Sequence, residues 1–274
     1  EKIYADAYVQ QSGSIGSFYP DVTNAVTKKM NYGCIFLNYV GHGSPDHIGS
    51  ERYMERSNIP NFSNTNSLPF FMASTCSWGK YDDPDDVSGA EIFLLSANGG
   101  GIGVVAASRP ISHNSQVDTK ISLELFASHN GIQNTIGDAV RMMKNDFNTT
   151  HALTLFGDPA LKLSLPKYNV AVTKINDSDV IHGIADTATV LSRIKISGEI
   201  QDISGNIVND FEGKLYATVF DKKSLHRTLA NDNEETETDF RQQKNVLFKS
   251  QDTVINGKFE YSFIVPKDVS YKYD

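Results

Sequence analysis

Three short, nearly continuous apolar segments constrain the fold of this chain more than any other feature. They are CIFLNYV at 34–40, LPFFMAST at 68–75 and IGVVAA at 102–107. Apolar runs of this length, without polar alternation, are typical of strands that are buried on both faces of a parallel sheet. Segments with helical character lie before, between and after them, at 21–30, 88–97, 117–129 and 135–147. Strands that alternate with helices predict an α/β fold, with a mostly parallel sheet flanked by helices.

Local signals place some of these elements. Pro20 stands where a helix tolerates proline, at its first turn, and Ser88 with Glu91 forms the pattern of a capping box. Residues 2–8 alternate as a strand does, and LTLFGDPALKL at 153–163 predicts two short strands around a Gly-Asp-Pro turn.

The patterning changes near Pro166, which divides the chain into two predicted domains, 1–166 and 167–274. Beyond this point the segments with strand character are 194–200, 213–220, 246–250 and 258–265. Asn256-Gly257 is a strong signal for a tight hairpin. Strands at this spacing suggest a β-sandwich. The chain starts at Glu1 and stops at Asp274 without a turn signal, so we expect the first domain to be incomplete at its N-terminus and the second at its C-terminus.

Composition excludes several classes of protein. The 274 residues are 39% hydrophobic, which is enough for a packed core. The net charge is −8 and no basic cluster is present, so nucleic acid is not an expected partner. No apolar stretch approaches the roughly 20 residues of a spanning helix. The only cysteines, Cys34 and Cys76, are too few for a disulfide framework. Because they lie at opposite ends of neighbouring predicted strands, we expect both to be free.

Two of the predicted strands lead into residues whose side chains can take part in catalysis. The first runs into Gly41-His42-Gly43 and the second into Cys76. Ligands of open α/β sheets collect beyond the carboxyl ends of the strands, so His42 and Cys76 would face one another if these strands are neighbours. A histidine beside a cysteine can generate a thiolate nucleophile. The Gly43 and Cys76 amides would then form an oxyanion hole.

Other interpretations of these residues compete with this one. A single cysteine at the end of a strand is commonly a core residue. Ser44 lacks the flanking glycines of a nucleophile elbow, and His42, Asp46 and His47 lack the spacing of a zinc site, so we predict no catalytic serine and no metal.

Two further features past Cys76 have both a structural and a functional interpretation. The four acids Asp82, Asp83, Asp85 and Asp86 are typical of a solvated loop, although they suit calcium or a basic substrate as well. Trp78 either lines a substrate groove or packs in the core.

Four motifs in order resemble the gingipain-type cysteine peptidases, which belong to the caspase-like clan. They are LNYVGHGSPDHIGSERYM, FFMASTCSWGKYDDPDD, GGGIGVVAASRP and LFGDPALKL, within residues 1–165. The aromatic residue and Tyr81-Asp-Asp-Pro84 after the cysteine are more similar to the secretion-sortase branch of the family. The resemblance implies Cys76 as nucleophile, His42 as general base, and Gly43 and Cys76 as oxyanion donors. It places the acid that orients the histidine upstream of Glu1, and it implies an immunoglobulin-like domain after the peptidase domain.

The resemblance further implies a function in the type IX secretion system of Bacteroidetes. The substrates would be proteins with C-terminal secretion signals, cleaved through a thioester that an amine of lipopolysaccharide can resolve. Other outer-membrane proteins of the system would be partners, and the location would be the cell surface, the outer membrane or the exterior. The alternatives are a secreted gingipain-like endopeptidase and a non-catalytic scaffold with a peptidase-like fold.

Overall fold

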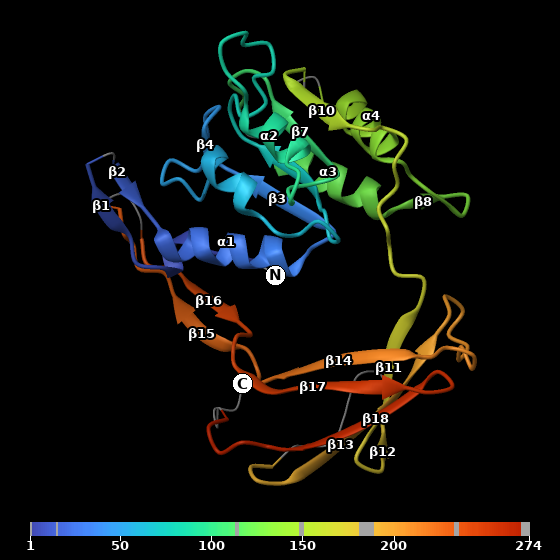
Figure 1. Cartoon of the computed structure of the whole chain (residues 1–274). Helices are drawn as coiled ribbons and strands as arrows, with labels where there is room; N and C mark the ends of the chain where they lie inside the picture. Colours follow the sequence, from blue (N-terminus) through green and yellow to red (C-terminus); the bar gives the residue numbers. More distant parts are fainter. Residues whose placement is uncertain are drawn as a thin grey trace. The chain divides into compact units, whose positions relative to one another are not determined.

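The computed structural model describes residues 2–14, 16–112, 115–147, 151–180, 189–232 and 236–269. The chain divides into two compact units (Figure 1). Unit 1 contains Glu1–Leu165 together with Leu229–Thr236, and unit 2 contains Pro166–Thr228 and Glu237–Asp274. The short segment at 229–236, which the sequence division assigns to the second domain, therefore belongs with the first unit.

Unit 1 is built on a four-stranded sheet with the order β10-β7-β6-β3. These strands are β3 (Phe36–Val40), β6 (Phe70–Ser74), β7 (Gly103–Ala107) and β10 (Leu153–Gly157). The pairs β3–β6 and β6–β7 are parallel, and β10 runs antiparallel to β7. The predicted mostly parallel sheet is confirmed, with the three apolar runs as its three parallel strands.

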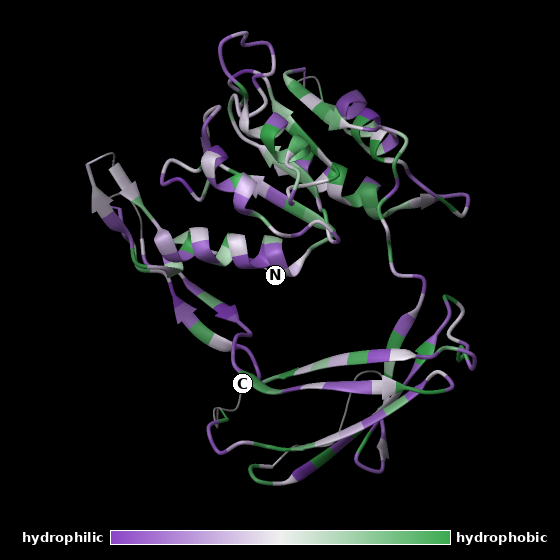
Figure 2. Cartoon of the chain, viewed as in Figure 1, coloured by the Kyte–Doolittle hydropathy of each residue, from purple (hydrophilic) through white to green (hydrophobic). Residues whose placement is uncertain are grey.

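Helices cover both faces of this sheet, and alternate residues along each strand decide which helices they meet. Phe70 and Met72 of β6 pack in one apolar cluster with α3 (Ser115–Phe126) and α4 (Ile136–Asp146). Phe71 and Ala73 pack in a second cluster with α1 (Pro20–Tyr32) and α2 (Gly89–Leu95). In Figure 2 the hydrophobic colour concentrates on the strands of this sheet. The result is a layered helix–sheet–helix unit, because a parallel sheet must bury both of its faces.

Short-range signals set where these helices begin. Pro20 occupies the first turn of α1. The Ser88 side chain accepts a hydrogen bond from the Glu91 amide, and the Glu91 carboxylate accepts one from the Ser88 amide, so the predicted capping box is confirmed. Thr135 and Asp138 form the same arrangement at the start of α4. Each capping box satisfies backbone donors that have no partner within the helix.

Three local expectations are wrong. The strand β3 is not buried on both faces, because it lies at the end of the sheet order and Val40 is 39% exposed. Residues 2–8 do not form a strand; instead Ala5–Ala7 form a 3-10 turn, η1. Only the first of the two strands predicted at 153–163 exists. The Leu161 amide donates a hydrogen bond to the Asp158 carbonyl in a turn, and Leu163 packs into the core without forming part of a strand.

Unit 2 is entirely antiparallel in its described residues. One sheet has the order β12-β11-β13-β18, and the pair β14-β17 forms another. Side chains from both sheets, such as Ile194, Phe263 and Phe248, share one apolar cluster. At the predicted hairpin, Asn256 and Gly257 both adopt positive φ between Ile255 and Lys258, as a tight hairpin turn requires. The strands that leave this turn pair in different sheets, β17 with β14 and β18 with β13.

The bounds of the strands in unit 2 are β11 Asn169–Ile175, β12 Ser178–Asp179, β13 Arg193–Gln201, β14 Gly213–Phe220, β15 Ser224–Arg227, β16 Asp239–Gln242, β17 Val246–Val254 and β18 Lys258–Ile264. The minor elements of unit 1 are β1 Gln11–Gly13, β2 Gly16–Phe18, β4 His47–Ile48, β5 Met54–Glu55, the 3-10 helix η2 Arg56–Asn61, β8 Ser128–His129 and β9 Ile132–Gln133. Within the described residues, no helix is both long and apolar enough to cross a membrane.

Candidate active site

His42 and Cys76 follow two strands that are direct neighbours. In the parallel pair β3–β6, Val40 lies opposite Ser74, and each of the two residues lies two positions beyond this pair. The Gly41 amide donates to the Ser74 carbonyl at 3.3 Å, which extends the contact past the strand ends. The parallel sheet therefore brings the two segments side by side at its carboxyl edge, where such folds place their ligands.

Gly43 packs directly against the residue that precedes the cysteine. A side-chain carbon at position 43 would overlap Thr75 Oγ1 and lie 3.1 Å from the His47 carbonyl oxygen. Thr75 is almost fully buried, so it has no room to move aside. Glycine is required here because only a residue without Cβ allows the two backbones to approach so closely.

Within the described residues, the backbone amides expected to act as oxyanion donors are not used in other hydrogen bonds. Neither the Gly43 nor the Cys76 amide donates a hydrogen bond to any of the described residues. The chain turns sharply after Cys76, where Ser77 takes a φ of 57°. A left-handed conformation at a residue other than glycine is strained, and such residues concentrate at functional sites.

The Cys76 side chain is half-buried and its Sγ donates to the Ile111 carbonyl at 3.6 Å. A carbonyl acceptor binds the thiol form and not the thiolate, so this contact must break before the sulfur acts as a nucleophile. Cys34 is also free, as expected. Burial raises the pKa of the Cys34 thiol, and the nearby Lys29 lowers it to a smaller extent.

The His42 main chain is fixed, while its ring is exposed. Its carbonyl accepts hydrogen bonds from the Tyr39 hydroxyl at 2.9 Å and from the Gly49 amide at 2.7 Å. No described side chain hydrogen-bonds the ring itself. His42 lines a cleft of about 970 Å³ along the outer edge of β3. The contact of Tyr39 with the His42 carbonyl was not predicted from the sequence, because a tyrosine within a strand is ordinarily a packing residue.

Neither Asp6 nor Asp46 orients the His42 ring in the described structure. Both carboxylate oxygens of Asp6 accept from the amides of Ala230 and Asn231. Asp46 instead pairs with Arg56 at 2.8 Å. The acid expected for this role stays a prediction for a position before Glu1.

The serine and zinc alternatives find no support in the described residues. Ser44 Oγ accepts from the Asp46 and His47 amides, so it caps a turn. The His47 ring bonds the Gly49 carbonyl at 2.9 Å, and no group of three metal-ligating side chains is found in the described part of the chain.

Three of the four acids after Cys76 have basic partners. Asp82 forms a two-pronged pair with Arg109, Asp83 pairs with Lys80, and Asp86 pairs with Arg56. Hydrogen bonding from the Arg109 guanidinium lowers the pKa of Asp82 to about 2. The loop is thus held by ion pairs, and a calcium ion would have to compete with three cationic side chains.

We therefore expect calcium to have little effect on this protein. Adding 1 mM CaCl₂ should raise the Tm by less than about 1 °C, because a ligand that does not bind the folded state selectively does not stabilise it. Differential scanning calorimetry with and without calcium, and with magnesium as the control, measures this. A calcium-specific rise in Tm that disappears in Asp82→Asn would contradict it.

Of the two interpretations of Trp78, packing in the core is correct and lining a substrate groove is wrong. Its side chain is 0% exposed and packs edge-on against Phe71, with ring centroids 5.3 Å apart. Gly89, at the start of α2, leaves room for the indole, since a Cβ there would collide with it.

We predict that Trp78→Phe weakens the fold without affecting the site. The free energy of unfolding should fall by about 1–2 kcal/mol from lost packing, and no hydrogen bond is lost, since the indole N–H has no partner in the described structure. Urea denaturation measures the change. Tyr32→Phe, at an 84% exposed position, is the control and should change it by less than about 0.5 kcal/mol. A Trp78→Phe protein with full stability but altered substrate affinity would restore the groove interpretation.

Comparison with known proteins decides the family. The model of peptidase family C25 matches residues 1–164. The chain belongs to peptidase family C25. Among solved structures it is similar to gingipain RgpB from Porphyromonas gingivalis in complex with its pro-domain. The identity is 18% and the TM-score 0.46, and the match covers 90% of this chain and 51% of that one. A second structure of RgpB, described as an Arg-specific cysteine proteinase, has 16% identity, a TM-score of 0.45 and coverage of 90% and 50%.

A third similar structure is dimeric latent PorU from Porphyromonas gingivalis. The identity is 28% and the TM-score 0.36, with coverage of 55% of this chain and 15% of that chain. The present chain thus spans about half the length of the RgpB chains and a smaller part of PorU. No match to a curated protein was found. The family expected from the four sequence motifs is confirmed.

Proposed function

We propose that this chain carries the catalytic pair of a C25 cysteine peptidase, with Cys76 as nucleophile and His42 as general base. The observation that supports this most is the parallel register of β3 and β6, which pairs Val40 with Ser74, two residues before His42 and Cys76 respectively. The free amides of Gly43 and Cys76 at the same sheet edge support their assignment as oxyanion donors.

The reaction follows from these roles. His42 removes the proton from the Cys76 thiol, and the sulfur attacks the carbonyl carbon of the scissile peptide bond. The developing oxyanion accepts hydrogen bonds from the two amides. As the C–N bond breaks, His42 returns the proton to the leaving amine, and the acyl group stays on sulfur as a thioester. Water or another amine then attacks the thioester and releases the thiol.

The substrate class is the next part of the proposal. We infer proteins with a C-terminal secretion signal of the type IX system, with transfer of the acyl group to an amine of anionic lipopolysaccharide. The basis is the similarity of the motif after the cysteine to the sortase branch. A location at the cell surface or outer membrane, with other secretion proteins as partners, belongs to the same proposal. So does an immunoglobulin-like character for unit 2.

Mass spectrometry of a cargo protein incubated with the full-length enzyme separates the candidate functions. A sortase gives a shortened C-terminus joined to an amine, a gingipain-like endopeptidase gives a hydrolysed C-terminus or internal cuts, and a scaffold leaves the cargo unchanged. Cys76→Ala should abolish either product, and Cys34→Ala is the matched control that should preserve it. Unchanged cargo with the unmodified enzyme would contradict a catalytic function.

A further inference from the structure

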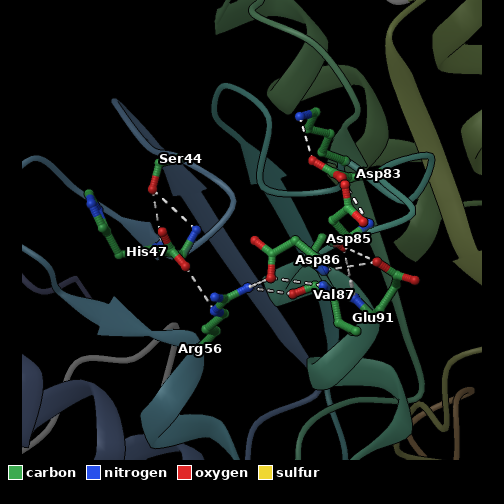
Figure 3. Close-up of polar contacts among 11 residues, drawn as sticks. Ser44, His47, Arg56, Asp83, Asp85, Asp86, Val87 and Glu91 are labelled. Atoms are coloured by element: carbon green, nitrogen blue, oxygen red, sulfur yellow. Dashed lines mark hydrogen bonds and ion pairs between the residues drawn. The ribbon is translucent and has the colours of Figure 1, made fainter.

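Two loops flank the candidate catalytic pair, and one side chain lies between them. The histidine loop, residues 42–48, follows β3. The acidic loop, residues 82–88, follows the turn after Cys76 and leads into α2. Arg56, the first residue of η2, contacts both loops (Figure 3).

The guanidinium of Arg56 contacts acceptors in both loops. Its Nε lies 2.8 Å from Asp46 Oδ1 in the histidine loop. Its Nη1 donates to Asp86 Oδ1 at 2.5 Å and to the Val87 carbonyl at 2.8 Å in the acidic loop. The Arg56 amide also donates to the Asp46 carbonyl at 2.7 Å. The residue is therefore fixed through both its backbone and its side chain.

The two loops also meet through their backbones. The Gly89 amide, at the start of α2, donates to the Pro45 carbonyl at 3.0 Å. This hydrogen bond lies beside the ion pairs of Arg56 and joins the same two segments. It therefore provides a local measure of whether the loops stay together.

The chemistry of this contact favours arginine over lysine. One exposed ion pair contributes little to stability, but the Arg56 side chain is only 30% exposed and binds two carboxylates and a carbonyl at once. A planar guanidinium can direct separate N–H groups to each acceptor, whereas an ammonium group is a single point charge. Only arginine can hold both loops with one side chain.

We propose that Arg56 is a positioning residue that holds the histidine loop against the acidic loop and so fixes His42 relative to Cys76. Its effect on catalysis rests on the proposed function, whereas its effect on the loops does not. A small displacement of a catalytic base slows turnover strongly and leaves substrate binding largely intact.

Hydrogen–deuterium exchange and kinetics on the full chain test this proposal. In Arg56→Ala the Gly89 amide should exchange about tenfold faster, because loss of the contacts frees the loops locally. In the same variant kcat should fall by about tenfold or more with KM changed by less than about twofold. In Arg56→Lys, both the exchange rate of the Gly89 amide and kcat should lie between those of the unmodified protein and those of Arg56→Ala. Arg52→Ala is the matched control, since among the described residues the Arg52 side chain pairs only with its neighbour Glu55, at 3.0 Å, and bridges no loops.

Each outcome has a distinct meaning. Unchanged exchange of Gly89 in Arg56→Ala overturns the proposal, and so does equal acceleration in Arg52→Ala. Faster Gly89 exchange with unchanged kcat in an active enzyme overturns the positioning role. If the unmodified protein has no His42-dependent reactivity at Cys76, the proposed function fails, while faster Gly89 exchange in Arg56→Ala still supports the role of Arg56 in holding the loops.

Discussion

Iodoacetamide is expected to modify Cys76 before Cys34 in the native protein, and His42→Ala should slow the reaction at Cys76 about tenfold at pH 7. The physical reason is that alkylation requires the thiolate, which an adjacent imidazole favours by accepting the thiol proton. Burial raises the pKa of Cys34, so below that pKa its thiol stays protonated and reacts slowly. Peptide mapping by mass spectrometry over a time course gives both rates in one experiment.

Peptidase turnover should depend on the same two residues, with a larger loss than the loss of alkylation rate. We expect Cys76→Ala to lower kcat by at least about 10³-fold, as removal of a nucleophile does in other peptidases. His47→Ala is the control for the histidine, because the His47 ring bonds the Gly49 carbonyl and is not assigned a catalytic role. Equal alkylation rates at the two cysteines, or no effect of His42→Ala, would show that the nucleophile and base are wrongly assigned.

Gly43→Ala should reduce turnover about 100-fold while the protein stays folded. The new Cβ would overlap Thr75 Oγ1, so the histidine loop must move away from the residue before Cys76. A displacement of about 1 Å at a catalytic group is enough for a loss of this size. Steady-state kinetics measures the loss, and circular dichroism confirms that the fold is retained.

A second substitution makes this prediction specific. Thr75→Ala removes the atoms that collide, and the Thr75 hydroxyl has no partner in the described structure, so its loss leaves no unsatisfied group. We therefore expect Gly43→Ala with Thr75→Ala to recover most of the activity. Thr75→Val keeps the bulk and should give no recovery. Equal activity of the two double variants would show that the collision is not the cause.

The fold of unit 1 was largely predictable because its signals are local. Apolar runs predicted β6 and β7, which are buried throughout, and the Ser88–Glu91 pattern predicted the start of α2. The strand predicted at residues 2–8 is absent because alternation over a few residues is a weak signal. The apolar run at 34–40 predicted a strand but gave no information on which neighbours it has, so the exposure of β3 was missed.

The candidate site likewise has features that the sequence predicts and features that depend on tertiary packing. The sequence by itself determined the chemical types, since His42 and Cys76 each follow an apolar strand, and it determined the family through four motifs in order. Only the tertiary structure decided that β3 and β6 are paired in register, that Gly43 lies against Thr75, and that Trp78 is buried. It also revealed Arg56, whose partners Asp46 and Asp86 lie 10 and 30 residues away. Contacts across such distances depend on how the loops pack, and no local pattern of residues encodes that packing.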